Sequence, residues 1–193
     1  MRRIDVVERV TLDGVMQAPG APDEDPSGGF EHGGWAAPYD DEVLVREMSK
    51  GMGSHELLLG RRTYEILRSA WAEPTEPNPF SAVLTETPKY VASTTLEEPL
   101  PWANSTLLDG DAVADVARLK EADGKDLVIM GSGKLAQALM EAGLIDAFTL
   151  LIHPVVLGEG RRLFPDGGAL AKMRLDELTT TTKGVAIATY RPG

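Results

Sequence analysis

The sequence contains no cysteine among its 193 residues, which excludes disulfide bonds and thiolate metal sites. It also has no apolar run long enough to cross a bilayer as a helix. Its three histidines lack the spacing of metal ligands, and the G-x-S-x-G motif of a nucleophile elbow is absent. These absences argue against a disulfide-stabilised scaffold, a helical membrane protein, a metalloenzyme and a serine hydrolase.

Positive charge is scarce as well. The chain has 19 Lys and Arg against 30 Asp and Glu, for a net charge of -11. Because nucleic acids and anionic membranes would repel such a chain, we expect neither as a partner. The N-terminus leads straight into a strand-like run without a secretory signal, so we expect a cytoplasmic protein. The length and the ordinary apolar fraction of 42% are typical of one globular domain, residues 1–193.

The apolar pattern predicts strands that alternate with helices and a final antiparallel hairpin. The predicted strands are residues 4–12, 56–59, 89–92, 105–108, 127–130, 147–157, 173–182 and 185–191; the predicted helices are 40–50, 61–71, 80–84, 111–122 and 134–142. This order predicts a mixed, mostly parallel sheet with helices on both faces. The strand at 147–157 contains Pro154, so we expect a bulge or bend there. The irregular loop at 19–34 is either functional or a loose surface insertion.

The most informative stretch is a strand, a glycine turn and a helix at residues 126–136. The apolar run ends at Gly131-Ser132-Gly133, and a helical pattern begins at once with Lys134. Backbone N–H groups in such a turn can approach an anion closely, so the turn predicts a site for a phosphate-bearing ligand. The segment fits G-x-G-x-x-A, but the later acidic residue of a Rossmann unit and the spacing of a P-loop are both missing. Glycines that serve packing alone remain the alternative.

Two further strand ends carry chemistry that suits phosphate. Gly60-Arg61-Arg62-Thr63 opens a helix, where cations oppose the helix dipole unless an anion is bound. The alternative is a pair of surface arginines, with a salt bridge to Glu65. Ser93-Thr94 supplies hydroxyl groups after another strand. Because the carboxyl ends of parallel strands meet at one edge of a sheet, the three segments together predict one anion site.

Taken together, these segments resemble the dihydrofolate reductase-like fold, and in particular the reductase domain of bacterial riboflavin biosynthesis and its stand-alone relatives. The resemblance covers nearly the whole chain. The segments that carry it are TLDG at 11–14, LLLGRRTYE at 57–65, PKYVAST at 88–94, the long run from VIMGSGKLAQALMEAGLIDAF to GRRLFP at 128–165, and the terminal hairpin.

The resemblance implies NADPH as the cofactor. It implies that the adenosine 2′-phosphate is held by the segment that starts at Gly60 and by the hydroxyl groups after the next strand. It also implies that the glycine turn holds the pyrophosphate. The cofactor residues are then Gly60, Arg61, Arg62, Thr63, Ser93, Thr94, Gly131, Ser132, Gly133, Lys134 and Leu135. Relatives of this fold commonly form homodimers, so we expect one here.

The substrate side follows from the run Trp35 to Asp40, which resembles the W-x-x-P-x-D of dihydrofolate reductase. Asp40 is the predicted proton donor, with Asp13 as the second candidate. Trp35 and Met16 are predicted to contact substrate. We expect hydride transfer from NADPH to a small polar molecule, either pterin-like or ribosylaminopyrimidine-like. The alternatives are a true dihydrofolate reductase and an NADPH-binding module without turnover.

Overall fold

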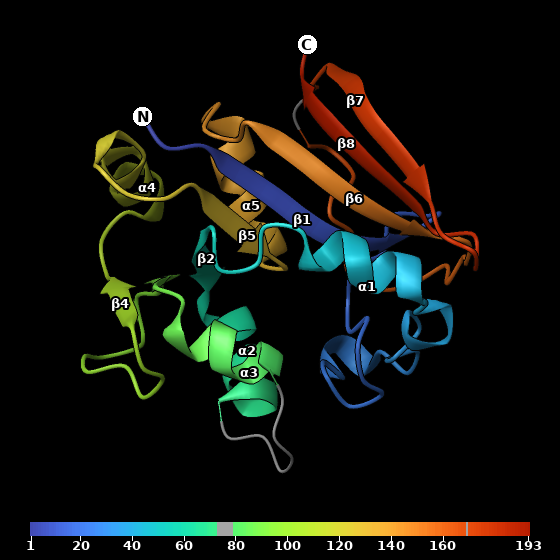
Figure 1. The fold of residues 1–193 in the computed structure, drawn as a ribbon, viewed down its shortest axis with the longest axis horizontal. Helices are drawn as coiled ribbons and strands as arrows, with labels where there is room; N and C mark the ends of the chain where they lie inside the picture. Colours follow the sequence, from blue (N-terminus) through green and yellow to red (C-terminus); the bar gives the residue numbers. More distant parts are fainter. Residues whose placement is uncertain (73–78, 169) are drawn as a thin grey trace. The chain divides into compact units, whose positions relative to one another are not determined.

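A computed structural model describes residues 1–72, 79–168 and 170–193 (Figure 1). The chain divides into two compact units. Unit 1 contains Met1–Asp5 and Gly51–Ile145, and unit 2 contains Val6–Lys50 and Asp146–Gly193. Strand β1 begins in unit 1 and continues in unit 2, so each unit is described below by itself.

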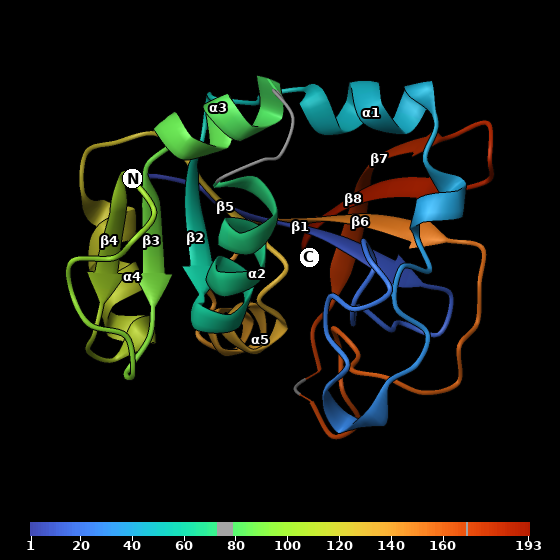
Figure 2. The ribbon, with the colours of Figure 1, turned by 90° about the horizontal axis from the view of Figure 1, so that it is seen from below.

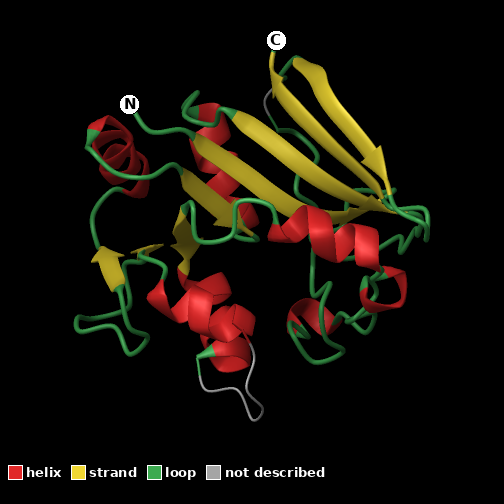
Figure 3. Ribbon diagram, viewed as in Figure 1, coloured by secondary structure: helices red, strands yellow, loops and turns green. Residues whose placement is uncertain are grey.

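The elements follow the predicted alternation of strands and helices (Figure 3). They are β1 Ile4–Thr11, two 3-10 turns at Ser27–Gly29 and Ala37–Tyr39, α1 Glu42–Ser49, β2 Glu56–Gly60, α2 Arg61–Trp71, α3 Pro79–Glu86, β3 Lys89–Ala92, β4 Ser105–Leu108, α4 Ala112–Glu121, β5 Leu127–Met130, α5 Gly133–Glu141, β6 Ala147–His153, β7 Met173–Thr180 and β8 Ala186–Pro192. The strand order is β4-β3-β2-β5-β1-β6-β8-β7. The predicted mixed α/β fold is confirmed.

Unit 1 is built on parallel strands. β2 pairs in parallel with both β3 and β5, and β3 pairs in parallel with β4. Helices α2 and α3 lie on one side of these strands, and α4 and α5 lie on the other (Figure 2). The side of α2 and α3 has an apolar core in which Tyr64 of α2 meets Leu59 of β2 and Val91 of β3. Burial of these side chains fixes α2 against the end of its own strand.

Lys89 is a fully buried cation in this unit, with 1% of its surface exposed. Its ammonium group donates hydrogen bonds to the carbonyl oxygens of Leu84, Thr85 and Thr87, at 2.7, 3.2 and 2.6 Å. It also lies 4.5 Å from the centre of the Trp102 ring. The ammonium thus satisfies the last carbonyl groups of α3, which have no partner within the helix. Burial lowers the pKa of Lys89 to about 8.

Replacing Lys89 by methionine is expected to destabilise the protein by about 2 kcal/mol, because buried carbonyl groups lose their donor while the apolar stem is kept. Urea unfolding at pH 7 measures this loss. The matched control is Lys125→Met, since Lys125 donates to a single carbonyl, that of Gly53, at the surface. Equal unfolding midpoints for the two variants would contradict the capping role of Lys89.

In unit 2, the strands that follow β1 pair in an antiparallel arrangement. β6 pairs with β8, and β8 pairs with β7 in the antiparallel hairpin that the sequence predicted. Helix α1 places Leu44 against Leu151 of β6 and Ile187 of β8. The prediction that the strand starting at residue 147 extends to residue 157 is wrong, because β6 ends at His153. The next residue is Pro154, which has no N–H group to continue the ladder.

Candidate functional site

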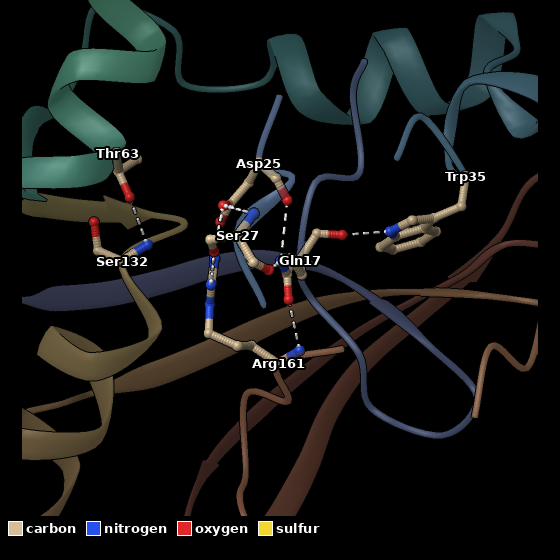
Figure 4. A network of polar contacts seen from close by, with 7 residues as sticks. All are labelled: Gln17, Asp25, Ser27, Trp35, Thr63, Ser132 and Arg161. Carbon is tan, nitrogen blue, oxygen red and sulfur yellow. Dashed lines mark hydrogen bonds and ion pairs between the residues drawn. The ribbon is translucent and has the colours of Figure 1, made fainter. Parts of the chain in front are cut away.

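In unit 1, a pair of hydroxyl groups joins two of the strand-to-helix turns. The Oγ1 atom of Thr63 in α2 accepts a hydrogen bond from the backbone N–H of Ser132, at 3.0 Å (Figure 4). In return, the Oγ atom of Ser132 accepts a hydrogen bond from the backbone N–H of Gly60, at 2.9 Å. The two contacts hold the start of α2 beside the start of α5.

Backbone geometry at this contact requires a glycine. Gly131 has φ of +63°, in the left-handed region that favours glycine. A Cβ atom at Gly131 would lie 3.1 Å from Cγ2 of Thr63 and 3.3 Å from its Oγ1. Ser132 itself has φ of +61°, which is costly for a residue with a side chain. The turn is therefore held in a strained conformation by the contact with α2.

The N–H groups of the first turn of a helix have no partner within the helix itself. Neither α2 nor α5 has a side-chain cap on its first turn, and neither has an acidic residue there. The free N–H groups at the start of a helix, together with its dipole, favour an anion. Two such helix starts that adjoin through Thr63 and Ser132 can bind one extended, multiply charged group.

The third predicted segment reaches the same end of the strands. Gly60 and Ala92 are direct partners in the parallel ladder, so Arg61 and Ser93 follow at neighbouring strand ends. The Oγ atom of Ser93 accepts hydrogen bonds from the N–H groups of Thr95 and Leu96. Arg61 forms an ion pair with Glu65, at 3.1 Å, as the salt-bridge alternative anticipated. Both of these side chains are about half exposed, so the pair is weak.

The structure thus brings the three predicted anion-binding segments of unit 1 to one end of adjacent strands. The side chains of Arg61, Arg62, Thr94 and Lys134 are exposed there. Leu135 is 8% exposed and packs into the unit. The expectation that these strand ends lie side by side is confirmed; the binding roles of the residues remain predictions.

In unit 2, Asp40 is paired with a cation that sequence reasoning did not identify. The Nη1 atom of Arg9 donates to Oδ1 of Asp40 at 2.9 Å. The side chains are 26% and 47% exposed, so solvent and ligands can reach both. Asp40 directly follows the 3-10 turn Ala37–Tyr39. The next residue, Asp41, is the N-cap of α1, and its side chain accepts a hydrogen bond from the N–H of Leu44. Because Asp41 caps the helix, the carboxylate of Asp40 is not needed for the cap and pairs with Arg9 of β1.

His153 lies close to this ion pair and is fully buried. Its Nδ1 atom is 2.8 Å from the carbonyl oxygen of Leu151, which identifies Nδ1 as the protonated nitrogen of a neutral ring. Burial lowers the pKa of His153, and the charge of Arg9 adds to this, while backbone hydrogen bonds to Leu151 and Val10 and the charge of Asp40 oppose it. The rings of Trp35 and Tyr39 meet the imidazole edge-on, at 5.1 and 5.7 Å between centroids. Within the residues that the structure describes, Nε2 has no hydrogen-bond partner.

Asp13, the second predicted proton donor, closes the turn after β1. Its carboxylate accepts hydrogen bonds from Oγ1 of Thr11 at 2.6 Å and from the N–H groups of Leu157 and Gly158. These bonds, that of Thr11 above all, lower the pKa of Asp13 to about 2. The carboxyl is therefore charged at neutral pH and holds the turn that leads to Met16.

The long loop after this turn is tied down by a polar network (Figure 4). The Nε2 atom of Gln17 donates to the carbonyl oxygens of Asp25 and Ser27, and its Oε1 atom accepts from the N–H of Arg161. Arg161 also forms an ion pair with Asp25 and donates to Oγ of Ser27. The backbone oxygen of Gln17 accepts from the indole of Trp35 at 2.7 Å. The loop is thus an ordered part of unit 2.

Sequence reasoning missed Arg9, His153, Gln17 and Arg161 as members of these clusters. Arg9 did give a signal, since a charged residue interrupts an otherwise apolar strand. The other three gave none, because no local pattern in the sequence marks the contacts that they make. In the described part of the chain, no group of three or more His, Cys, Asp or Glu side chains could hold a metal ion. No helix there is long and apolar enough to cross a membrane.

Comparison with solved structures places the fold in the dihydrofolate reductase-like class. A dihydrofolate reductase from Enterococcus faecalis complexed with NADP(H) superimposes with a TM-score of 0.63 at 13% identity, over 99% of this chain and 96% of that one. A putative riboflavin biosynthesis protein from Shewanella has a TM-score of 0.69 at 21% identity, over 99% of each chain. A pyrimidine reductase-like protein from Corynebacterium diphtheriae has a TM-score of 0.65 at 12% identity, over 100% of this chain and 92% of that one.

The chain belongs to the RibD C-terminal domain family, whose sequence profile matches residues 3–187. It is also 36% identical to the uncharacterized protein YyaP of Bacillus subtilis over 103 residues, or 53% of each chain. The uncharacterized protein YwjB of the same organism is 37% identical over 70 residues, 36% of this chain and 40% of YwjB. These matches span about half or less of the curated relatives.

Proposed function

We propose that this chain is an NADPH-dependent reductase of a small polar molecule, either pterin-like or ribosylaminopyrimidine-like. The observation that carries the proposal is the junction of two uncapped helix starts through Thr63 and Ser132, next to exposed arginines, in a chain of the RibD C-terminal domain family. A phosphorylated dinucleotide has the charges that such a junction favours. We further propose that both units form one reductase domain, residues 1–193.

The proposed cofactor site assigns separate tasks to the three segments. Arg61 and Arg62, with the hydroxyl groups of Thr63, Ser93 and Thr94, would hold the adenosine 2′-phosphate, because guanidinium groups bind phosphate with two parallel hydrogen bonds. The turn at Gly131, Ser132, Gly133 and Lys134, with Leu135 close by, would hold the pyrophosphate at the start of α5. Gly60 would keep the start of α2 beside this turn through its N–H bond to Ser132. NADPH supplies the hydride when bound, and the protein supplies position and charge.

The proposed substrate site is in unit 2. Asp40 and Trp35 would face the substrate, and Met16 would border it, since its N–H is held by the carbonyl oxygen of Arg161. Asp40 remains our candidate for the residue that assists proton transfer, because it is the more exposed of the two carboxylates. Asp13, with a pKa of about 2, would contribute by holding in place the turn that follows β1. The expected homodimer and the cytoplasmic location also remain predictions.

The deciding experiment is a titration of tryptophan fluorescence with NADPH and, in parallel, with NADH. We expect wild-type protein to bind NADPH more tightly, and the double variant Arg61→Ala/Arg62→Ala to lose about tenfold or more in NADPH affinity with little change for NADH. Arg68→Ala, an exposed arginine in the last turn of the same helix, is the matched control. Equal affinity of the wild type for the two dinucleotides would refute the assignment to a 2′-phosphate.

Two alternatives make different predictions. A true dihydrofolate reductase, favoured by the shared fold, would bind methotrexate and oxidise NADPH in the presence of dihydrofolate. A binding module without turnover would bind NADPH but would not oxidise it, whichever carbonyl or imine compound is added. Steady-state NADPH oxidation with a panel of pyrimidine, pterin and simple carbonyl substrates separates the three cases.

A further inference from the structure

The turn between β7 and β8 holds the start of α1 through one carboxylate (Figure 1). Oδ2 of Asp41 accepts hydrogen bonds from the backbone N–H of Thr182 at 2.8 Å, from its Oγ1 at 2.6 Å, and from the N–H of Lys183 at 3.2 Å. Oδ1 of Asp41 accepts from the N–H of Leu44 and caps the helix. The two oxygen atoms therefore have separate tasks, one in the helix and one at the turn.

The turn presents its donors because its own hydrogen bonds fix its shape. The N–H of Thr181 donates to the carbonyl oxygen of Val185, and the N–H of Gly184 donates to the carbonyl oxygen of Thr181. Gly184 has φ of +85°, a conformation that glycine adopts without strain. The two consecutive N–H groups between these bonds donate to Asp41 instead. Consecutive N–H groups of a turn form a site that favours an anion.

The anion at this turn is the carboxylate of Asp41. Its hydrogen bonds, that from the Thr182 hydroxyl above all, lower the pKa of Asp41 to about 2, and desolvation opposes them. The side chain is therefore charged at neutral pH. Hydrogen bonds to a charged acceptor are stronger than those between neutral groups, so the contact ties the hairpin turn firmly to the start of α1.

A second contact from the same turn holds the other side of Asp40. Nζ of Lys183 donates to the carbonyl oxygen of Pro38, at 2.9 Å, in the 3-10 turn Ala37–Tyr39. Asp40 lies between that 3-10 turn and Asp41. The hairpin turn therefore fixes the backbone on both sides of Asp40, although it lies more than 140 positions later in the chain.

The ion pair of Asp40 with Arg9 needs such support. Both side chains are partly exposed, and an exposed ion pair gains little because two flexible side chains must be ordered in solvent. A backbone that is already fixed leaves less conformational freedom to lose. The carboxylate of Asp40 can then keep its position against Arg9 at 2.9 Å.

We propose that Asp41, Thr182 and Lys183 are positioning residues that hold the carboxylate of Asp40 against Arg9. The three act through Asp40 and are not themselves catalytic residues. The proposal rests on the proposed function, because Asp40 is the residue that assists proton transfer there. The turn of the terminal hairpin then belongs to the substrate side of the reductase.

The experiment follows the guanidinium group of Arg9 by NMR of the full chain. Arg9→Lys identifies the signal by its loss, and Asp40→Ala gives the signal of an unpaired guanidinium. Asp41→Ser is the decisive variant, because serine caps a helix as well as aspartate does but has a single side-chain oxygen. We expect it to move the Arg9 signal at least about half of the way to its position in Asp40→Ala. The matched control is Asp111→Ser at the N-cap of α4, which should leave the Arg9 signal unchanged.

Variants of the turn separate positioning from structural support. Thr182→Val removes the hydroxyl donor and should shift the Arg9 signal in the same direction as Asp41→Ser. Thr182→Ser keeps the hydroxyl and should show the wild-type signal. Lys183→Met keeps the apolar stem but releases the carbonyl group of Pro38, so it should also shift the signal. A merely structural role predicts a lower urea midpoint in these variants with an unchanged Arg9 signal.

The proposal is overturned if the Arg9 signal is unchanged in Asp41→Ser, or if Thr182→Val and Thr182→Ser shift it equally. Circular dichroism shows that each variant is folded, and the exposed Thr182 pair decides the question if Asp41→Ser is not. An NADPH titration of the same samples keeps the two failures distinct. Wild type that does not bind NADPH refutes the proposed function, whereas normal NADPH binding with an unchanged Arg9 signal refutes the positioning role alone.

Discussion

Replacing Glu8 by glutamine is expected to stabilise the protein at and above neutral pH and to leave it unchanged near pH 5. Glu8 lies on β1 with 4% of its surface exposed. One carboxyl oxygen accepts from the N–H of Arg9, and the other is buried without a partner in the described ranges. Burial raises the pKa of Glu8 from 4.5 to about 8, and the charge of Glu24 adds to this, while the Arg9 contacts oppose it.

The direction of the effect follows from proton binding. Below pH 4.5 the carboxyl is protonated in both the folded and the unfolded chain, so stability does not depend on its titration. Between pH 4.5 and about 8 the unfolded chain has lost the proton and the folded chain keeps it, so the free energy of unfolding falls by about 1.4 kcal/mol per pH unit. At pH 7 the loss is about 3 kcal/mol, and above pH 8 it levels off.

Urea midpoints measured from pH 5 to pH 8.5 test this expectation. The Glu8→Gln curve should be flatter than the wild-type curve, with the two converging at the acidic end. Glu177→Gln, at an exposed site on β7, is the control and should run parallel to wild type. Parallel curves for Glu8→Gln and wild type would mean that the carboxyl is already charged in the folded protein.

The second large effect is expected at Gly131. Alanine there must adopt φ of +63°, and its Cβ atom would approach the side chain of Thr63 to 3.1 Å. Relief of this contact separates the starts of α2 and α5, so the N–H groups of the two helices no longer converge. We expect Gly131→Ala to weaken NADPH binding by about a hundredfold, the equivalent of losing one or two hydrogen bonds to a charged group.

Two controls isolate the cause. Gly143 also has a left-handed φ, +68°, in the same unit, but a Cβ atom there meets nothing within 4 Å. Gly143→Ala therefore carries the backbone strain without the steric contact, and it should keep its NADPH affinity. Thr63→Val removes the hydroxyl that accepts from Ser132 and should reproduce part of the loss. A Gly131→Ala protein with wild-type affinity would disprove the role of the junction.

The strand ends of unit 1 could be predicted because local pattern determines them. An apolar run that stops at glycine and is followed by helical periodicity specifies where β2 and β5 end and α2 and α5 begin, and parallel strands must end together. The contact between Thr63 and Ser132 could not be predicted, since it depends on the left-handed turn at Gly131 and on the neighbouring positions of β2 and β5.

The polar groups of unit 2 were beyond prediction for a different reason. Arg9 and Asp40 are separated by 31 positions, and the pairing of Asp13 with residues after β6 spans more than 140. No periodic pattern encodes contacts of this range. The end of β6 was misjudged because the apolar run continues past Pro154, whereas the ladder requires an N–H group that proline lacks.

The network around Gln17 also determines where the chain can change in length. Because Gln17 and Arg161 hold Asp25 and Ser27, and the indole of Trp35 bonds to residue 17, the loop is divided into short closed stretches. Lengthening a closed stretch costs little entropy when the added residues reach solvent. Gly28 and Gly29 are exposed, and nothing lies within 4 Å of a Cβ atom placed on either. Extra residues are therefore best accommodated between these two glycines, and a change in spacing between Gln17 and Asp25 would break the network itself.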